Sequence, residues 1–146
     1  MHESQISELI KVNIESPILL TKYVSRSMLI KQQGRIINIS SIIATTGFNG
    51  LSVYGATKAS LSGFTKSLAR ELGKAKITVN TVAPGYMKTA MTEGLEGAKL
   101  ESIKRRSPLG QLATVEDVAG TVSYLLSDDA KNITGTTITV DAGSSA

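Results

Sequence analysis

Short apolar runs alternate with longer helical patterns along this chain, and the alternation constrains its fold more than any other feature. The apolar runs at residues 35–41, 77–83 and 135–140 predict strands, and apolar residues at helical spacing cover residues 4–31 and 52–72. Strands separated by helices are joined by crossovers, which make the strands parallel and place the helices against the sheet. The sequence therefore predicts an α/β fold with three layers, in a single domain.

Proline, glycine and capping residues set the expected ends of the helices. Pro17 lies inside the first helical pattern and has no backbone N–H, so we expect a kink or break just before it, near Asn13. Gly73 is expected to cap the second helix. Thr114 followed by Asp117 predicts the start of a third helix.

The segment between the second and third of these helices has low apolar density after its strand. Pro84 and Gly85 stop that strand, and residues 86–107 follow with few apolar side chains. We expect this segment to form a lid over a crevice, and we expect the third helix to end near Leu126.

Composition excludes several kinds of site. The 146 residues contain no Cys and one His, His2, which rules out a disulfide framework or a Cys nucleophile and predicts no metal centre. The net charge is +4, the basic residues are mostly scattered along the chain, and only 4% of residues are aromatic. No nucleic-acid partner is therefore predicted. No apolar run reaches the roughly 18–20 residues of a membrane span and the N-terminus lacks a signal-peptide pattern, which predicts a cytoplasmic protein.

Two polar side chains on the second helix are placed to share one site. Tyr54 and Lys58 stand at i and i+4, on one face of the helix. An ammonium group close to a phenol favours the phenolate, which makes Tyr54 a candidate general acid–base. The YxxxK pattern alone is also common on ordinary helix faces.

Further polar residues follow the carboxyl ends of the predicted strands, where ligands bind in open parallel sheets. Ser41 ends the first strand, and a hydroxyl there can meet the Tyr54 phenol at one carbonyl oxygen. Pro84-Gly85 follows the second strand into the same crevice. Asn13, at the expected helix break, lies where freed backbone groups can hold water. Taken singly, each of these residues also fits a turn, a cap or a solvated surface.

Together these motifs resemble the classical short-chain dehydrogenases/reductases. The family's catalytic tetrad matches Asn13, Ser41, Tyr54 and Lys58, and the resemblance also includes the final strand, although Ala142 stands where a glycine is usual. The resemblance implies the C-terminal part of a Rossmann-like, doubly wound sheet that reduces a ketone to a secondary alcohol with a nicotinamide cofactor.

The resemblance also assigns roles. Tyr54 is implied as the general acid, Ser41 as the group that holds the carbonyl oxygen, and Lys58 as the partner of the phenol and of the nicotinamide ribose. Tyr54, Lys58, Pro84, Gly85, Met87 and Thr89 are the implied cofactor contacts. The expected cofactor is NADP, with NAD left open.

Within the family, the chain looks most like the β-ketoacyl-acyl-carrier-protein and acetoacetyl-CoA reductases. The implied substrate is a 3-oxoacyl thioester, and an acyl carrier protein is a possible partner. Gln32 and Ala75 occupy places where arginines are expected to meet the carrier, with Lys31, Lys74 and Lys76 beside them. A sugar or steroid alcohol dehydrogenase is the alternative activity.

The 146 residues contain no T-G-x-x-x-G-x-G turn, the family's seat for the pyrophosphate. The resemblance therefore implies a C-terminal portion that lacks the N-terminal dinucleotide-binding units, roughly a hundred residues at about 30 per βαβ unit. We expect an open apolar sheet edge on the first strand. We also expect a dimer or tetramer assembled through the two long helices, with Leu61 and Phe64 among the candidates to face a partner. An inactive remnant that serves as an assembly module is a further alternative.

Overall fold

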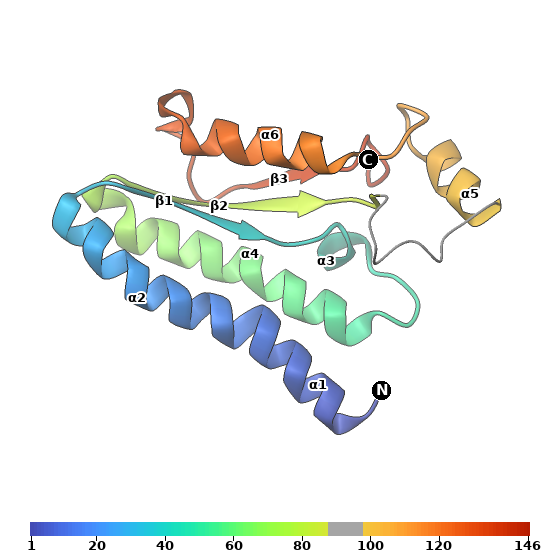
Figure 1. Cartoon of the computed structure of the whole chain (residues 1–146), viewed down its shortest axis with the longest axis horizontal. Helices are drawn as coiled ribbons and strands as arrows, with labels where there is room; N and C mark the ends of the chain where they lie inside the picture. Colours follow the sequence, from blue (N-terminus) through green and yellow to red (C-terminus); the bar gives the residue numbers. More distant parts are fainter. Residues whose placement is uncertain (88–97) are drawn as a thin grey trace.

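A computed structural model of the chain describes residues 1–87 and 98–146 and has helices on both sides of a parallel sheet (Figure 1). The sheet has three strands in the order β1-β2-β3, which are β1 (Gly34–Ile39), β2 (Ile77–Pro84) and β3 (Thr137–Val140). The first helices are α1 (Glu3–Ile10), α2 (Ser16–Lys31), α3 (Ile43–Thr46) and α4 (Ser52–Leu72). They are followed by α5 (Ala98–Arg106) and α6 (Val115–Leu126). The predicted α/β class and parallel sheet are confirmed.

Helix boundaries agree with the strongest sequence signals. The first long helix is interrupted by a π-helical turn over Lys11–Glu15, which is the break expected before Pro17. Thr114 forms the predicted cap of α6, since its backbone N–H donates to Asp117 Oδ2 at 2.8 Å and its Oγ1 accepts from Asp117 N at 3.2 Å. Gly73 is the C-cap of α4, as expected, and its backbone is right-handed with φ −59°. A 3₁₀ turn continues the chain there, and the left-handed residue is Lys76 with φ 58°.

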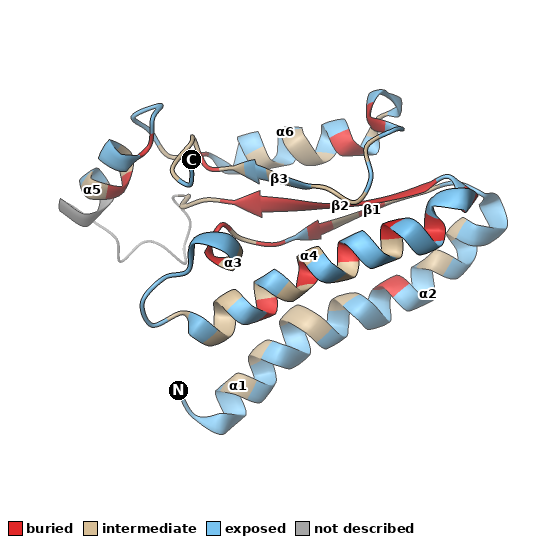
Figure 2. Ribbon diagram, turned by 180° about the vertical axis from the view of Figure 1, so that it is seen from behind, coloured by how far each residue is buried: buried red, intermediate tan, exposed pale blue. Residues whose placement is uncertain are grey.

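The middle strand is the centre of the core. Every residue of β2 is buried, because β1 and β3 pair along its two edges and helices cover its two faces (Figure 2). Val79 packs with Ile36 and Leu72 on the α4 side, while Val82 packs with Leu125 of α6 on the other. Among the described residues β1 pairs only with β2, and Ile39 at its end is 44% exposed. The expected open edge is therefore present.

A buried polar chain fixes α4 on the sheet. Asn38 Nδ2 of β1 donates to Thr65 Oγ1 of α4 at 2.8 Å. The Thr65 hydroxyl in turn bonds to Thr81 Oγ1 of β2, also at 2.8 Å. All three residues are buried, so each hydrogen bond replaces one that water would otherwise make.

This polar chain predicts a marked effect of Thr65→Val, which keeps the shape of the side chain and removes its hydroxyl. The buried Asn38 amide then loses its acceptor, and we expect a loss of about 1–3 kcal/mol in the free energy of unfolding. Urea denaturation followed by circular dichroism measures it. Thr121→Val on the exposed side of α6 removes a comparable hydroxyl bond to Asp117 O. A loss no greater than in that control would show that the buried chain contributes little.

Candidate active site

The lysine of the YxxxK pattern lies at the carboxyl end of β1. Lys58 Nζ donates a hydrogen bond to Ile39 O at 3.0 Å, and it stands 5.9 Å from the centroid of the Tyr54 ring. Burial lowers the pKa of Lys58 from its ordinary value of 10.5. The structure thus brings the helical i, i+4 pair together where the first strand ends.

The two serines after β1 have different surroundings. Ser40 is buried, and its Oγ donates to Lys58 O at 2.8 Å, which ties the end of the strand to the backbone of α4. Ser41 is half-buried, and its Oγ accepts from Ile43 N at 3.2 Å, at the start of α3. Ser41 therefore lies after the same strand end that Lys58 contacts. That its hydroxyl and the Tyr54 phenol address one carbonyl oxygen stays a prediction.

Asn13 reaches the site through a threonine that sequence patterns did not single out. Asn13 lies within the π-helical turn, and its Nδ2 donates to Thr57 Oγ1 at 3.1 Å. The Thr57 hydroxyl donates in turn to Tyr54 O at 2.8 Å, and Thr57 is buried. Asn13 is therefore connected to the backbone that carries Tyr54, and no direct contact with Lys58 is recorded. Thr57 is identified only by its hydrogen bond with Asn13 across the two helices. The periodicity of the sequence does not indicate this role.

The residue that follows β2 must be a glycine, because Asp141 lies too close for any other side chain. Gly85 N donates to Val140 O at 2.9 Å, and a Cβ at Gly85 would lie 2.5 Å from the Cβ of Asp141. Only glycine permits this approach, so the Pro84-Gly85 turn is packed against the end of β3. Met87 is half-buried. Thr89 and much of the expected lid lie outside the described residues.

The loop after β3 is organised by Asp141. Its carboxylate accepts from Gly143 N at 2.9 Å, Ser144 Oγ at 3.1 Å and Ser145 N at 2.8 Å. Burial by itself raises the pKa of Asp141, but the hydrogen bonds from Ser145, Gly143 and Ser144 outweigh it, so the pKa lies below its ordinary value. Ala142, at the place of the usual glycine, takes a left-handed φ of 56°, a conformation that costs an L-residue roughly 1–2 kcal/mol.

These residues fit one half of a nicotinamide dinucleotide. The Lys58 ammonium has three N–H donors, and Ile39 O is the acceptor recorded for it, so it has donors for the hydroxyls of a ribose. The phenol of Tyr54 lies beside it, and the Gly85 backbone ends the neighbouring strand. The pyrophosphate half has no corresponding glycine-rich turn in the 146 residues.

Fold, strand-end serine and YxxxK pair define a short-chain dehydrogenase/reductase, and comparison with known proteins agrees. The family model described as enoyl-(acyl carrier protein) reductase matches residues 1–145, and the chain belongs to this family. Among its curated relatives, the 3-oxoacyl-acyl-carrier-protein reductase of Escherichia coli is 42% identical over 143 residues. That of Haemophilus influenzae is 43% identical over the same length. Each match covers 98% of this chain and 59% of the relative.

Solved structures show the same fold. A gluconate 5-dehydrogenase from Burkholderia cenocepacia, solved in complex with NADP and tartrate, matches with a TM-score of 0.95 and 26% identity, over 99% of this chain and 58% of that one. A 3-oxoacyl-acyl-carrier-protein reductase from Brucella melitensis matches with a TM-score of 0.93 and 30% identity, over 98% and 54%. The chain therefore spans a little more than half the length of these proteins.

The Asp141 loop predicts a pH-dependent stability. A carboxylate with a lowered native pKa stabilises the fold above its unfolded value of about 3.9, and that contribution is lost as pH falls through the native pKa. We expect Asp141→Asn to cost about 1–3 kcal/mol at pH 7 and clearly less near pH 3, because below the unfolded value the unfolded chain takes up the proton and the contribution of the carboxylate to stability falls. Urea denaturation at both pH values measures the difference. Asp129→Asn, on an exposed carboxylate, is the control, and an equal cost of Asp141→Asn at the two pH values would contradict the argument.

Proposed function

We propose that this chain provides the carbonyl-reducing site of an NADP-dependent reductase acting on 3-oxoacyl thioesters. The observation that carries the proposal is the meeting of Lys58 Nζ, the Tyr54 ring and the end of β1 at one place. The identity of 42–43% with 3-oxoacyl-acyl-carrier-protein reductases supports the substrate class. NADP in the Burkholderia structure supports the cofactor.

In this proposal each residue has a distinct task. The nicotinamide, when bound, supplies a hydride to the ketone carbon. Ser41 donates a hydrogen bond to the carbonyl oxygen, and Tyr54 gives it a proton, so that a ketone becomes a secondary alcohol. Lys58 places a positive charge beside the phenol and binds the ribose hydroxyls. The backbone around Asn13 holds water that returns a proton towards Tyr54.

The contacts of the helices support this division of tasks. Ser40, at the end of β1, donates a hydrogen bond to Lys58 O, and Asn13 donates one to Thr57. The strand end and the π-helical turn therefore both bind to the same stretch of α4. Tyr54 and Lys58 therefore lie on a segment whose backbone is fixed from two sides. Such fixed positioning is what a site needs to hold reacting atoms within about 3–3.5 Å.

The gluconate 5-dehydrogenase match gives the main competing substrate class, a sugar acid. The fold likeness is as strong there, but the identity of 26% is well below that of the thioester reductases. The lysines beside the expected carrier-docking positions do not distinguish the two substrate classes. Lys31, Lys74 and Lys76 lie where β1 and β2 begin, at the other end of the sheet from the carbonyl site. Docking by an acyl carrier protein, and the cytoplasmic location that it implies, belong to the proposal. Among the described residues no helix is long and apolar enough to cross a membrane.

The proposed reaction is tested in a chimera in which the N-terminal segment of the Escherichia coli reductase precedes residues 1–146. The chimera should oxidise NADPH with acetoacetyl thioesters, and Tyr54→Phe should reduce kcat by at least about 100-fold, because the proton donor is gone. Residues 1–146 alone should show negligible turnover, since losing the pyrophosphate site costs several kcal/mol and each 1.4 kcal/mol is tenfold in affinity. Tyr124→Phe, at an exposed tyrosine of α6, is the matched control.

Several outcomes decide the proposal. A folded chimera without thioester turnover would refute it, and faster turnover of gluconate would favour the sugar-acid class. Micromolar binding of NADPH by residues 1–146 alone would show that the pyrophosphate argument is wrong.

The proposed assembly is a homo-oligomer formed through the long helices. The outer face of α2 exposes large apolar side chains, including Leu20 at 64% and Tyr23 at 72%. Phe64 of α4 is half-buried, but Leu61 is 3% exposed and packs inside its own chain. Of the two candidates to face a partner, Phe64 therefore remains and Leu61 does not, because its side chain is buried within its own chain.

Light scattering tests this assembly. The chain should have at least the mass of a dimer at micromolar concentration, and Leu20→Glu with Tyr23→Glu should lower it, because two charges would be buried against apolar groups. Leu109→Glu, at a side chain of similar exposure after α5, should leave the mass unchanged. A monomeric parent chain would contradict the proposal.

A further inference from the structure

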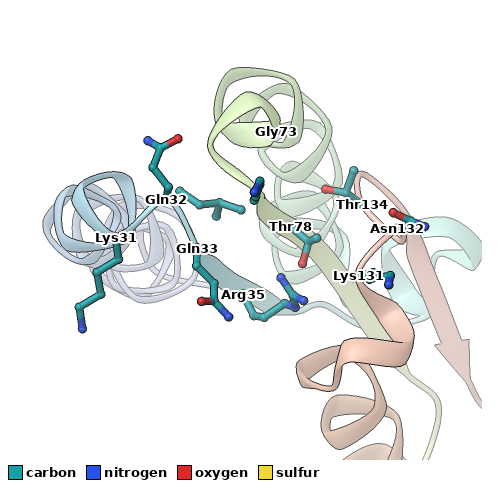
Figure 3. A pocket seen from close by; sticks show the side chains of 11 residues that line it. Lys31, Gln32, Gln33, Arg35, Gly73, Thr78, Lys131, Asn132 and Thr134 are labelled. Carbon is teal, nitrogen blue, oxygen red and sulfur yellow. The ribbon is translucent and has the colours of Figure 1, made fainter.

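A cavity of about 800 Å³, lined mostly by polar and charged residues, opens at the amino ends of β1 and β2 (Figure 3). Its walls come from the end of α2, the turn before β2 and the loop that precedes β3. The volume falls in the range of about 300–1,000 Å³ that is usual for small-molecule sites. The groups proposed for the reduction itself lie elsewhere, whereas Lys31, Gln32 and Lys76, which line the cavity, belong to the positions where the family resemblance places carrier docking.

The cavity lies at the opposite end of the sheet from the carbonyl site. β2 has eight residues from Ile77, which lines the cavity, to Pro84 at the candidate active site. At about 3.3 Å per residue the two sites are roughly 25 Å apart. A nicotinamide cofactor at the carboxyl ends of the strands therefore leaves this cavity free.

The charges around the cavity have one sign. Four cationic side chains line it, and no Asp or Glu is among the lining residues: Lys31, Arg35, Lys76 and Lys131. These cations come from three separate parts of the sequence, so only the fold assembles them. A concave site lined by one sign of charge concentrates ions of the opposite sign.

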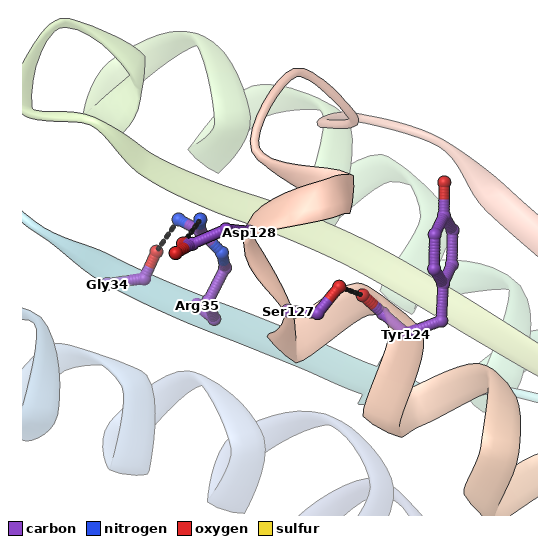
Figure 4. Close-up of polar contacts among 5 residues, drawn as sticks. All are labelled: Gly34, Arg35, Tyr124, Ser127 and Asp128. Atoms are coloured by element: carbon purple, nitrogen blue, oxygen red, sulfur yellow. Dashed lines mark hydrogen bonds and ion pairs between the residues drawn. The ribbon is translucent and has the colours of Figure 1, made fainter.

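Arg35 is the most enclosed of the four cations, with a side chain that is 14% exposed. Its Nη1 donates to Gly34 O at 3.2 Å, and its Nη2 lies 3.8 Å from Asp128 Oδ1 (Figure 4). The Asp128 side chain is 95% exposed, so water weakens this ion pair. Arg35 Nε is buried with no hydrogen-bond partner. The guanidinium, which reaches towards Thr78 in Figure 3, is thus only partly neutralised.

We propose that this basic cavity binds the phosphate group of a small phosphorylated molecule. The planar fork of Arg35 matches the geometry of phosphate oxygens, and Lys31, Lys76 and Lys131 provide point charges around it. Thr78 and Asn132 line the same cavity and offer donors for the rest of the ligand. A carrier protein fits less well, because its acyl group would have to reach a carbonyl site at the far end of the sheet.

The test is calorimetric titration of the 146-residue chain with inorganic pyrophosphate. We expect saturable binding of one equivalent, weakened about tenfold or more by the pair Lys76→Asn and Lys131→Gln. Both lysines are exposed, and asparagine tolerates the left-handed backbone of Lys76, so this variant should fold. Arg35→Lys keeps the charge but loses the fork, and it should also weaken binding. Lys22→Gln, on the exposed side of α2, removes one charge elsewhere and should leave binding unchanged.

Three results would overturn the proposal. They are the absence of saturable pyrophosphate binding, an equal loss in Lys22→Gln, and saturable binding of an apo acyl carrier protein that pyrophosphate does not displace. The titration is repeated on the chimera with the Escherichia coli segment, where loss of binding would be a fourth result against the proposal, because the cavity would then be a covered surface. The titration measures binding, so its result does not depend on whether the chimera reduces thioesters.

Discussion

The position of the candidate active site depends on the hydroxyl of Thr65. This one group accepts from Asn38 of β1 and bonds to Thr81 of β2, so it fixes α4 against two strands at once. α4 is an uninterrupted helix of 21 residues, and Tyr54 lies about 16 Å from Thr65 along its axis at 1.5 Å per residue. A rotation of the helix about this buried point would carry the phenol and the Lys58 ammonium away from the end of β1. The buried hydrogen bonds of Thr65 therefore align Tyr54 and Lys58 with the end of β1.

Long periodic segments were predictable because their signals are redundant. The helix expected over residues 52–72 has those bounds in the structure, since its apolar stripe and the Pro-free sequence agree over five turns. The Thr114–Asp117 cap also follows from sequence, because the capping chemistry is local. Lys58 lies at the end of β1, and its place there follows from the order of strands and helices, which determines which loops lie at the carboxyl edge.

Features that depend on distant contacts were not predictable. Thr57 gave no signal, because its role comes from Asn13, which lies 44 positions earlier in the chain. Gly73 caps α4 as expected, but the left-handed residue is Lys76, after the 3₁₀ turn that follows, and periodicity has nothing to detect there. The basic cavity was invisible for the same reason, since Lys31 and Lys131 are a hundred positions apart and meet only when the sheet forms.

The π-helical turn makes the length of the first helix matter more than its composition. Ser16 N bonds to Lys11 O, one residue further back than in an α-helix, so the turn contains one extra residue. Removing one residue from this stretch would let the turn close into regular α geometry, and α1 would keep nearly the same phase against α2, because the wider π turn takes up its extra residue within a single turn. Asn13 would then lose its alignment with Thr57. A single-codon deletion here would therefore displace Asn13 while leaving the faces that α1 and α2 present largely as they are.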